Sequence, residues 1–189
     1  MPNHKEKTRA AVANANAPAR TGGGPAPDRP DDPTPRSPAA AGVFLGLGLG
    51  GFFDGIVLHQ ILQWHHMVSG AGYPPTSVEN LRVNVLADGL FHAAAYAFTL
   101  IGLVFLWRGA RRPHAFWSTH GMVGAVLVGF GLFNLVEGIV NHHILQIHHV
   151  NETAPREQWL LWDIGFSLVG AALLAIGALL WRGASSPRP

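Results

Sequence analysis

Acidic and imidazole side chains lie inside the most apolar stretches of the sequence, which are long enough to cross a membrane. The acids are Asp54, Asp88, Glu137 and Asp163, and the histidines are His59, His65, His66, His92, His142, His143, His148 and His149. An ionised group in the hydrocarbon of a bilayer costs several kcal/mol, so such residues usually mark a functional site or pathway. We therefore expect each carboxylate to have a positive partner, which is a proton, a protonated histidine or a bound cation.

The motif that carries these residues occurs twice. Residues 54–66 read DGIVLHQILQWHH and residues 137–149 read EGIVNHHILQIHH, so nine of the 13 positions are identical. A tenth position exchanges the carboxylate of Asp54 for that of Glu137. With two spans in each copy, both copies point the same way and are related by an axis along the membrane normal. A site on that axis would receive matched ligands from both copies.

Helical spacing sorts the polar residues of each copy into two faces. At about 100° per residue, His59, Gln63 and His66 share one face, and Asp54 and His65 share a second face about 120° away. The second copy repeats this division, with His142, Gln146 and His149 on one face and Glu137, Asn141 and His148 on the other. We expect these groups to converge near the non-cytoplasmic surface.

Imidazole and carboxylate groups on facing helices are the usual components of metal sites in helical bundles. Such mixed ligands suit Fe, Zn, Mn and Cu(II), and without cysteine a Cu(I) site is less favoured. Asp88 and His92 add an acid and an imidazole one turn apart on the next span. The candidate metal ligands are therefore His59, His66, His142 and His149, then Asp88 and His92, with Asp54, Glu137, His65 and His148 completing the set. Whether Asp54 and Glu137 bind an ion directly or orient a ligand histidine is left open.

Several functions are compatible with this pattern. A divalent metal ion would serve a redox or hydrolytic metalloenzyme that uses metal-bound water or dioxygen. Haem held between His59 and His142 is an alternative cofactor. Translocation of ions or protons along the acidic and imidazole groups is a third hypothesis, and a purely structural polar network is a fourth. Neither the substrate nor the presence of any catalysis follows from the sequence.

Four long apolar stretches must position these residues, at about 41–67, 82–107, 117–150 and 158–181. Each is at least as long as the roughly 20 helical residues that cross a bilayer. Glycines in the first stretch supply the small-residue face on which membrane helices approach one another closely. The sequence predicts an all-α, integral membrane four-helix bundle built from two parallel two-helix repeats, at about 41–107 and about 117–181.

The ends of the chain differ in character from the apolar stretches. Residues 1–40 are rich in proline and charge and are expected to form a disordered cytoplasmic tail, and residues 184–189 form a C-terminal tail. Arginines concentrate in the tails and in the loop WRGARRPH at residues 107–114. Because cytoplasmic segments carry the excess of Lys and Arg, we expect both termini in the cytoplasm and the protein in the inner (plasma) membrane.

The composition excludes several classes of protein. Charged residues make up 13% of the chain and hydrophobic residues 48%, whereas about a quarter of a soluble domain is charged. The absence of cysteine excludes disulfides, thiolate metal sites and cysteine nucleophiles. No run of basic residues is interleaved with aromatic residues, so nucleic acid is not expected as a partner.

Three segments together resemble a known family. They are GGFFDGIVLHQILQWHHM at residues 50–67, DGLFHA at 88–93 and FNLVEGIVNHHILQIHHV at 133–150. Over residues 41–183 the chain is similar to a prokaryotic multi-pass membrane family described as a domain of unknown function. The resemblance implies contact with membrane lipid and lends weight to copper, haem or respiratory roles, either as a respiratory-chain component or as an oxidase assembly factor. It implies no particular activity, and a homo-oligomer is also left open.

Overall fold

The computed structural model describes residues 39–111 and 118–185, and all regular structure within these ranges is helical. The helices are α2 (Ala39–Phe52) continued by the π-helix η1 (Phe53–Ile61), α3 (Val78–Ala110), α4 (Thr119–Glu137) continued by the π-helix η2 (Gly138–Ile144), and α5 (Trp159–Ser185) after a 3-10 turn, η3 (Arg156–Gln158). Because α2 begins at Ala39, the helix starts slightly before the predicted residue 41. The other residues of the predicted N-terminal tail (1–38) and residues 186–189 of the predicted C-terminal tail lie outside the described ranges.

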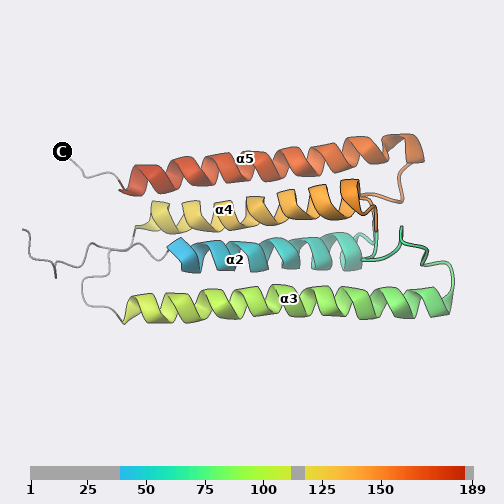
Figure 1. The fold of residues 1–189 in the computed structure, drawn as a ribbon, viewed down its shortest axis with the longest axis horizontal. Helices are drawn as coiled ribbons and strands as arrows, with labels where there is room; N and C mark the ends of the chain where they lie inside the picture. Colours follow the sequence, from blue (N-terminus) through green and yellow to red (C-terminus); the bar gives the residue numbers. More distant parts are fainter. Residues whose placement is uncertain (1–38, 112–117, 186–189) are drawn as a thin grey trace, which may run out of the picture. The chain divides into compact units, whose positions relative to one another are not determined.

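Helices α2 and α4 form the centre of the bundle. Helix α3 packs on α2, α2 packs on α4, and α4 packs on α5, as Figure 1 shows. In the most apolar part of each span, 50% of the first and 39% of the third is buried, but only 11% of α3 and of α5. The predicted all-α four-helix architecture is confirmed, with the two copies of the repeated motif on the two central helices.

Close approach of α2 and α4 depends on glycine. A Cβ atom on Gly46 would collide with the carbonyl oxygen of Val126, and one on Gly129 would collide with the carbonyl oxygen of Val43. Gly46 and Gly129 occupy matching positions in the two copies of the repeat. Small residues at such a crossing allow the backbones of two membrane helices to come into contact. The glycine-rich face predicted from the sequence therefore joins the two repeats.

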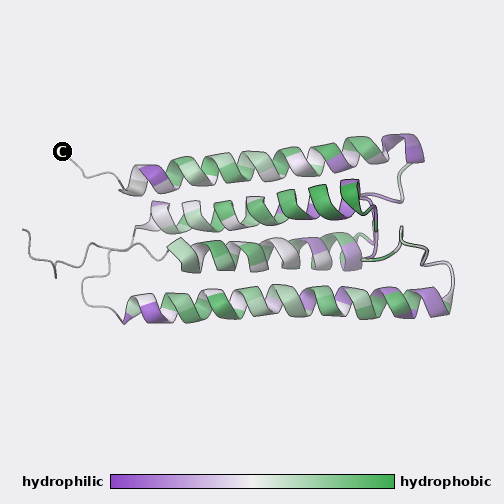
Figure 2. Ribbon diagram, in the orientation of Figure 1, coloured by the Kyte–Doolittle hydropathy of each residue, from purple (hydrophilic) through white to green (hydrophobic). Residues whose placement is uncertain are grey.

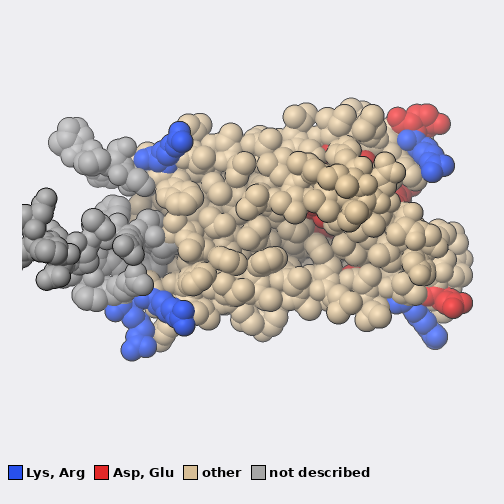
Figure 3. All heavy atoms as spheres, viewed as in Figure 1, with Lys and Arg blue, Asp and Glu red and all other residues tan. Residues whose placement is uncertain are grey.

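The outer surface of the bundle is apolar along its length. Large hydrophobic side chains are exposed on the outer helices, including Leu90 on α3 and Leu161 on α5. In Figure 2 the hydrophilic residues gather toward the ends of the helices, and in Figure 3 the charged residues on the visible face lie mainly at the two ends. All four helical segments are long and apolar enough to cross a membrane. This surface fits a protein surrounded by lipid.

The first and third spans end earlier than predicted. Helical structure stops at Ile61 and Ile144, before the expected ends at residues 67 and 150. The chain then turns through Gln63 and Gln146, both with φ of 49°. Two loops, residues 62–77 and 145–155, follow these turns. We call the end of the bundle that they cover the loop end.

Candidate metal centre

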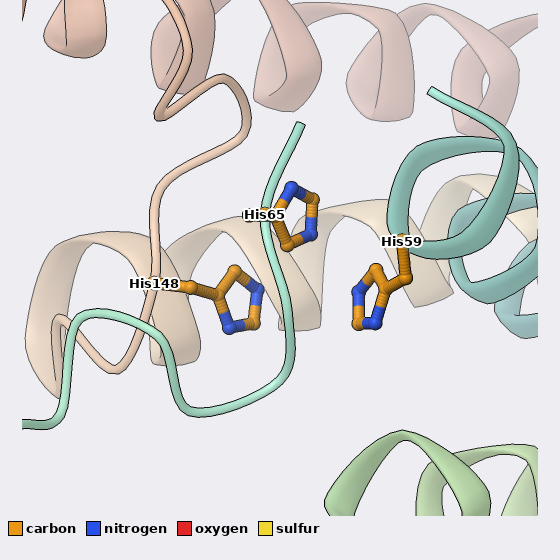
Figure 4. Close-up of side chains that lie close together, drawn as sticks. All are labelled: His59, His65 and His148. Carbon is orange, nitrogen blue, oxygen red and sulfur yellow. The ribbon is translucent and has the colours of Figure 1, made fainter. Parts of the chain in front are cut away.

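Four buried imidazole rings, two from each repeat, gather at the loop end. His59 lies on η1 and His142 on η2, whereas His65 and His148 lie in the loops that follow. The rings of His65 and His148 stack with their centroids 4.5 Å apart and their planes 8° from parallel. His59 lies 4.4 Å from His65, and His142 lies 4.9 Å from His148, between ring centroids. Figure 4 shows the rings of His59, His65 and His148 turned toward a common space.

The two stacked histidines are each held by the backbone of the other repeat. His65 Nδ1 donates to the carbonyl oxygen of Val150 at 2.8 Å, and His148 Nδ1 donates to that of Met67 at 3.0 Å. Because a carbonyl oxygen only accepts, the hydrogen of each ring must be on Nδ1. The other nitrogen, Nε2, is therefore directed into the cluster in both residues. Each loop thus orients the stacked histidine of the other loop.

The two helical histidines face carboxylates of the outer helices. His59 Nδ1 lies 2.9 Å from Asp88 Oδ1 on α3. In the second repeat, His142 Nδ1 lies 3.7 Å from Asp163 Oδ1 on α5, too far for a hydrogen bond. A carboxylate behind one ring nitrogen fixes the orientation of the imidazole and makes the opposite nitrogen more basic. Asp88 is thus within hydrogen-bond distance of His59 in the first repeat, whereas Asp163 lies farther from His142 in the second.

The inward nitrogens are short of partners. Nε2 of His59, His65 and His142 is buried and makes no hydrogen bond within the described structure. An unpaired buried polar group costs about 1–3 kcal/mol, so a cluster of them is a candidate site for a ligand. Potential ligand atoms within 4.8 Å of one another form two groups, which are His59, His65 and His148, and Glu137, His142 and His148. Both groups are fully buried.

Two further carboxylates border the cluster, and their surroundings differ. Glu137 Oε1 accepts from His148 Nε2 at 2.8 Å, and Glu137 Oε2 accepts from Asn141 Nδ2 at 2.6 Å. Asp54, the matching acid, has Oδ2 3.1 Å from His59 Nε2, yet neither of its oxygens makes a hydrogen bond. The position that matches Asn141 is Leu58, which has no donor to offer. Asp54 is therefore a buried acid that lies close to His59 but makes no hydrogen bond.

The two stacked histidines have pKa values displaced in opposite directions. Burial and the neighbouring rings of His148 and His59 hold the pKa of His65 well below its usual range. Burial also acts to lower the pKa of His148, but the hydrogen bond and the negative charge of Glu137 outweigh it and raise that pKa. His65 is thus neutral at physiological pH, with a lone pair on Nε2 available to an ion.

The structure brings together some of the predicted ligands and separates others. His66 and His149 lie outside both groups of potential ligands. His66 Nδ1 bonds to Asp88 Oδ2 at 2.8 Å, and His149 Nδ1 bonds to Asp163 Oδ2 at 2.7 Å. His66 thus shares the Asp88 carboxylate with His59, in agreement with their predicted common face. His65, which was predicted on another face, instead lies 4.4 Å from His59 between ring centroids. His65 and His148 occupy the places in the cluster that the helical spacing predicted for His66 and His149.

Three further residues, His92, His143 and Asp88, lie outside both groups of potential ligands. His92 Nδ1 donates to the backbone oxygen of Asp88 at 2.8 Å, one turn earlier on α3. His143, next to His142, is exposed. Asp88, which was also predicted as a ligand, accepts from His59, His66 and the backbone N–H of Met67.

Asp163 was not among the metal ligands predicted from the sequence. Asp163 is buried and accepts from the backbone N–H of Val150 at 2.9 Å as well as from His149. Asp88 makes the matching pair of contacts, to Met67 and His66, in the first repeat. Asp163 and Asp88 are each followed three residues later by a phenylalanine, Phe166 and Phe91, and this shared spacing is the sequence signal for their match. The carbonyl groups of Val150 and Met67, which orient the stacked histidines, have no signal in the sequence.

Comparisons with known proteins agree with the membrane architecture. The family described as predicted membrane protein (DUF2243) matches residues 41–184, which is most of the chain. No curated protein and no solved structure matches the chain.

Proposed function

The chain belongs to this family of predicted membrane proteins, and we propose that it binds a transition-metal ion in the buried histidine cluster at the loop end. The ligands are drawn from His59, His65, His142 and His148, with Asp54 and Glu137 beside them. Asp88 and Asp163 act from behind the rings by orienting His59 and His142. The ion compensates the buried negative charge of the carboxylates.

One observation carries this proposal. The Nδ1 atoms of His59, His65 and His148 are occupied by acceptors, while Nε2 of His59, His65 and His142 has no hydrogen-bond partner. Metal-binding histidines characteristically donate one ring N–H to a carboxylate or a carbonyl and use the other nitrogen for the ion. A network that served only packing would instead be expected to satisfy both nitrogens of each ring, since unpaired buried atoms are costly.

The donor set narrows the chemistry. Imidazole with carboxylate suits Zn, Fe, Mn and Cu(II). Three protein ligands leave a tetrahedral ion one open position, which is typical of catalytic rather than structural sites. We therefore favour a redox or hydrolytic role over a purely structural one. A redox-inert ion such as zinc would support hydrolysis only, so the identity of the metal decides between these roles.

Elemental analysis of the detergent-purified protein tests the proposal. We expect wild-type protein to retain a transition metal, and His148→Asn, which removes the imidazole common to both groups of potential ligands, to lose most of it. Asparagine keeps a donor near the position of Nδ1 for the Met67 carbonyl and removes Nε2. His143→Ala, at an exposed position next to His142, is the matched control and should retain the metal. Equal metal content in wild-type protein and His148→Asn, or none in either after supplying each metal, would refute the assignment.

The same sample distinguishes the alternative cofactor and mechanism. A Soret band in the optical spectrum would indicate haem in place of a metal ion. The buried polar side chains of the described residues lie in the half of each span nearest the loop end, for example Asp54, Asp88 and Asp163. A conduit would need polar groups through the full thickness of the membrane, so this distribution supports a site over a translocation path. Rapid loss of the ion to a mild chelator would instead favour delivery to a respiratory oxidase.

We also propose an orientation in the inner membrane. Arg108, Arg111 and Arg182 lie at the end of the bundle opposite the loops, whereas Arg82 and Arg156 lie at the loop end. The excess of arginine favours the cytoplasm for the first of these ends. The histidine centre would then be near the non-cytoplasmic surface.

A further inference from the structure

His148 belongs to both groups of potential metal ligands. Its imidazole lies with His59 and His65 in one group and with Glu137 and His142 in the other. His148 Nδ1 is already used by the Met67 carbonyl at 3.0 Å. Only Nε2 remains, and once it has given up the proton that it donates to Glu137 it offers a single lone pair. One ring nitrogen of this kind binds one ion at a time, so the two groups cannot both be complete.

The two groups differ in chemical character. His59, His65 and His148 offer three imidazoles and no charge, which suits a borderline ion such as Zn²⁺. Glu137, His142 and His148 offer two imidazoles and a carboxylate, the combination found at open sites for Fe²⁺. Carboxylate oxygen also suits Mn²⁺, a harder ion. The choice of group therefore depends on the ion.

Only the second repeat has a carboxylate prepared for this role. Asn141 Nδ2 holds Glu137 Oε2 at 2.6 Å, which leaves Glu137 Oε1 directed at His148 Nε2. His142 Nε2 lies 3.6 Å from the same oxygen. In the first repeat Leu58 replaces the asparagine. Asp54 Oδ2 lies 3.1 Å from His59 Nε2, but neither oxygen of Asp54 makes a hydrogen bond that would hold it in place. The sequence difference at one position thus makes the two halves of the centre unequal.

Resting on the metal centre proposed above, we infer that His148 is a shared ligand between two mutually exclusive ion sites. The first, His59, His65 and His148, takes Zn²⁺, and the second, Glu137, His142 and His148, takes Mn²⁺ or Fe²⁺. Binding in the first site removes His148 from Glu137. Binding in the second site removes it from His59 and His65. The ion that is supplied thus determines which of the two groups His148 joins.

Two substitutions separate the sites. His65→Asn removes a ligand from the imidazole site only, and Glu137→Gln removes the carboxylate from the other site with little change in size. We expect His65→Asn to weaken Zn²⁺ binding by more than about 100-fold, above the range for residues that only orient a ligand. It should leave Mn²⁺ binding nearly unchanged. Glu137→Gln should do the reverse, and His148→Ala should weaken both ions.

The measurements are Zn²⁺ titration against a chromophoric chelator and Mn²⁺ titration by electron paramagnetic resonance, with purified full-length protein and His143→Ala as the control. In wild-type protein, added Zn²⁺ should release bound Mn²⁺. His65→Asn and Glu137→Gln should each still bind one of the two ions, which would demonstrate that these variants are folded. Equal weakening of both ions in both variants, or Mn²⁺ and Zn²⁺ bound together at full occupancy, would overturn the shared-ligand proposal while leaving the metal centre intact. Failure of wild-type protein to bind either ion would instead overturn the metal centre.

Discussion

The rings of His65 and His148 lie 4.5 Å apart and almost parallel, and each is held by a carbonyl of the other repeat. Their different charge states follow from their neighbours. His148 faces Glu137, which stabilises its protonated form, whereas His65 is surrounded by other imidazoles and is held neutral. Stacking a neutral ring on a charged one avoids the repulsion that two imidazolium rings would have.

This relationship predicts how the metal-free protein responds to pH. Because the pKa of His65 is lowered in the folded protein, its contribution to stability is present above the unfolded pKa of about 6.5 and is lost as the pH falls below that value. One such group gives a slope of at most about 1.4 kcal/mol per pH unit. The thermal midpoint of chelator-treated protein should therefore fall between pH 7 and pH 5.

The control for this prediction is His65→Asn, which has no proton to take up and should flatten the acid side of the curve. His148 acts in the opposite sense, because its pKa is raised. Its contribution is complete below pH 6.5 and is lost as the pH rises through the raised value. If the thermal midpoint of His65→Asn fell between pH 7 and pH 5 as steeply as that of the wild-type protein, protonation of His65 would be excluded as the cause.

Loss of the Asp88 carboxylate should reduce the affinity for Zn²⁺ more than loss of the Asp163 carboxylate. Asp88→Asn removes the negative charge behind His59, and we expect it to weaken Zn²⁺ binding by about 10–100-fold, the usual cost of losing such a partner. Asp163→Asn should cost less, because Asp163 lies 3.7 Å from His142 whereas Asp88 lies 2.9 Å from His59. The measurement is competition with a chromophoric chelator.

Glu79→Gln is the matched control, since Glu79 is an exposed acid in the first turn of α3. It should bind Zn²⁺ as the wild-type protein does. An equal loss of affinity in Asp88→Asn and Asp163→Asn would contradict the geometry. So would a loss in Asp88→Asn as complete as that in His65→Asn, because Asp88 would then act as a ligand itself.

The four spans, the repeat and the matched positions of His59 and His142 in the two copies could be predicted from the sequence, because these depend on composition and identity of residues. The prediction failed at the ends of the first and third spans. A step of 100° per residue holds for an α-helix, but residues 53–61 and 138–144 form π-helices, whose i→i+5 hydrogen bonds widen each turn. Angles calculated from α-helical spacing therefore do not apply beyond that point.

The turns that follow the π-helices also change the directions of the histidines from those predicted. Gln63 and Gln146 adopt a positive φ, which is uncommon for residues other than glycine and has no recognisable sequence signal here. After that reversal His65 and His148 point into the cluster, and His66 and His149 point toward Asp88 and Asp163. Spacing along one helix carries no information about which of two adjacent histidines enters a site formed by loops.

The contact between α2 and α4 should be sensitive to a single methyl group. Gly46→Ala places a Cβ atom against the backbone of Val126, which cannot move as a side chain would. Forcing an extra group into a packed core typically costs about 1–3 kcal/mol, so the thermal midpoint in detergent, followed by tryptophan fluorescence, should fall. Gly165→Ala on α5 is the control, because nothing lies within 4 Å of its added Cβ. A similar midpoint for both variants would contradict the close approach.

Membrane orientation can be measured cleanly because the chain has no cysteine. Thr76→Cys introduces an exposed thiol at the loop end, and Gly183→Cys introduces one at the opposite end of α5. If arginine-rich segments face the cytoplasm, a membrane-impermeant maleimide should label Thr76→Cys in intact spheroplasts and should label Gly183→Cys only after permeabilisation. The reverse pattern would place the histidine centre near the cytoplasmic surface. An ion would then reach the centre from the cytoplasm, so the labelling pattern determines which compartment supplies the metal.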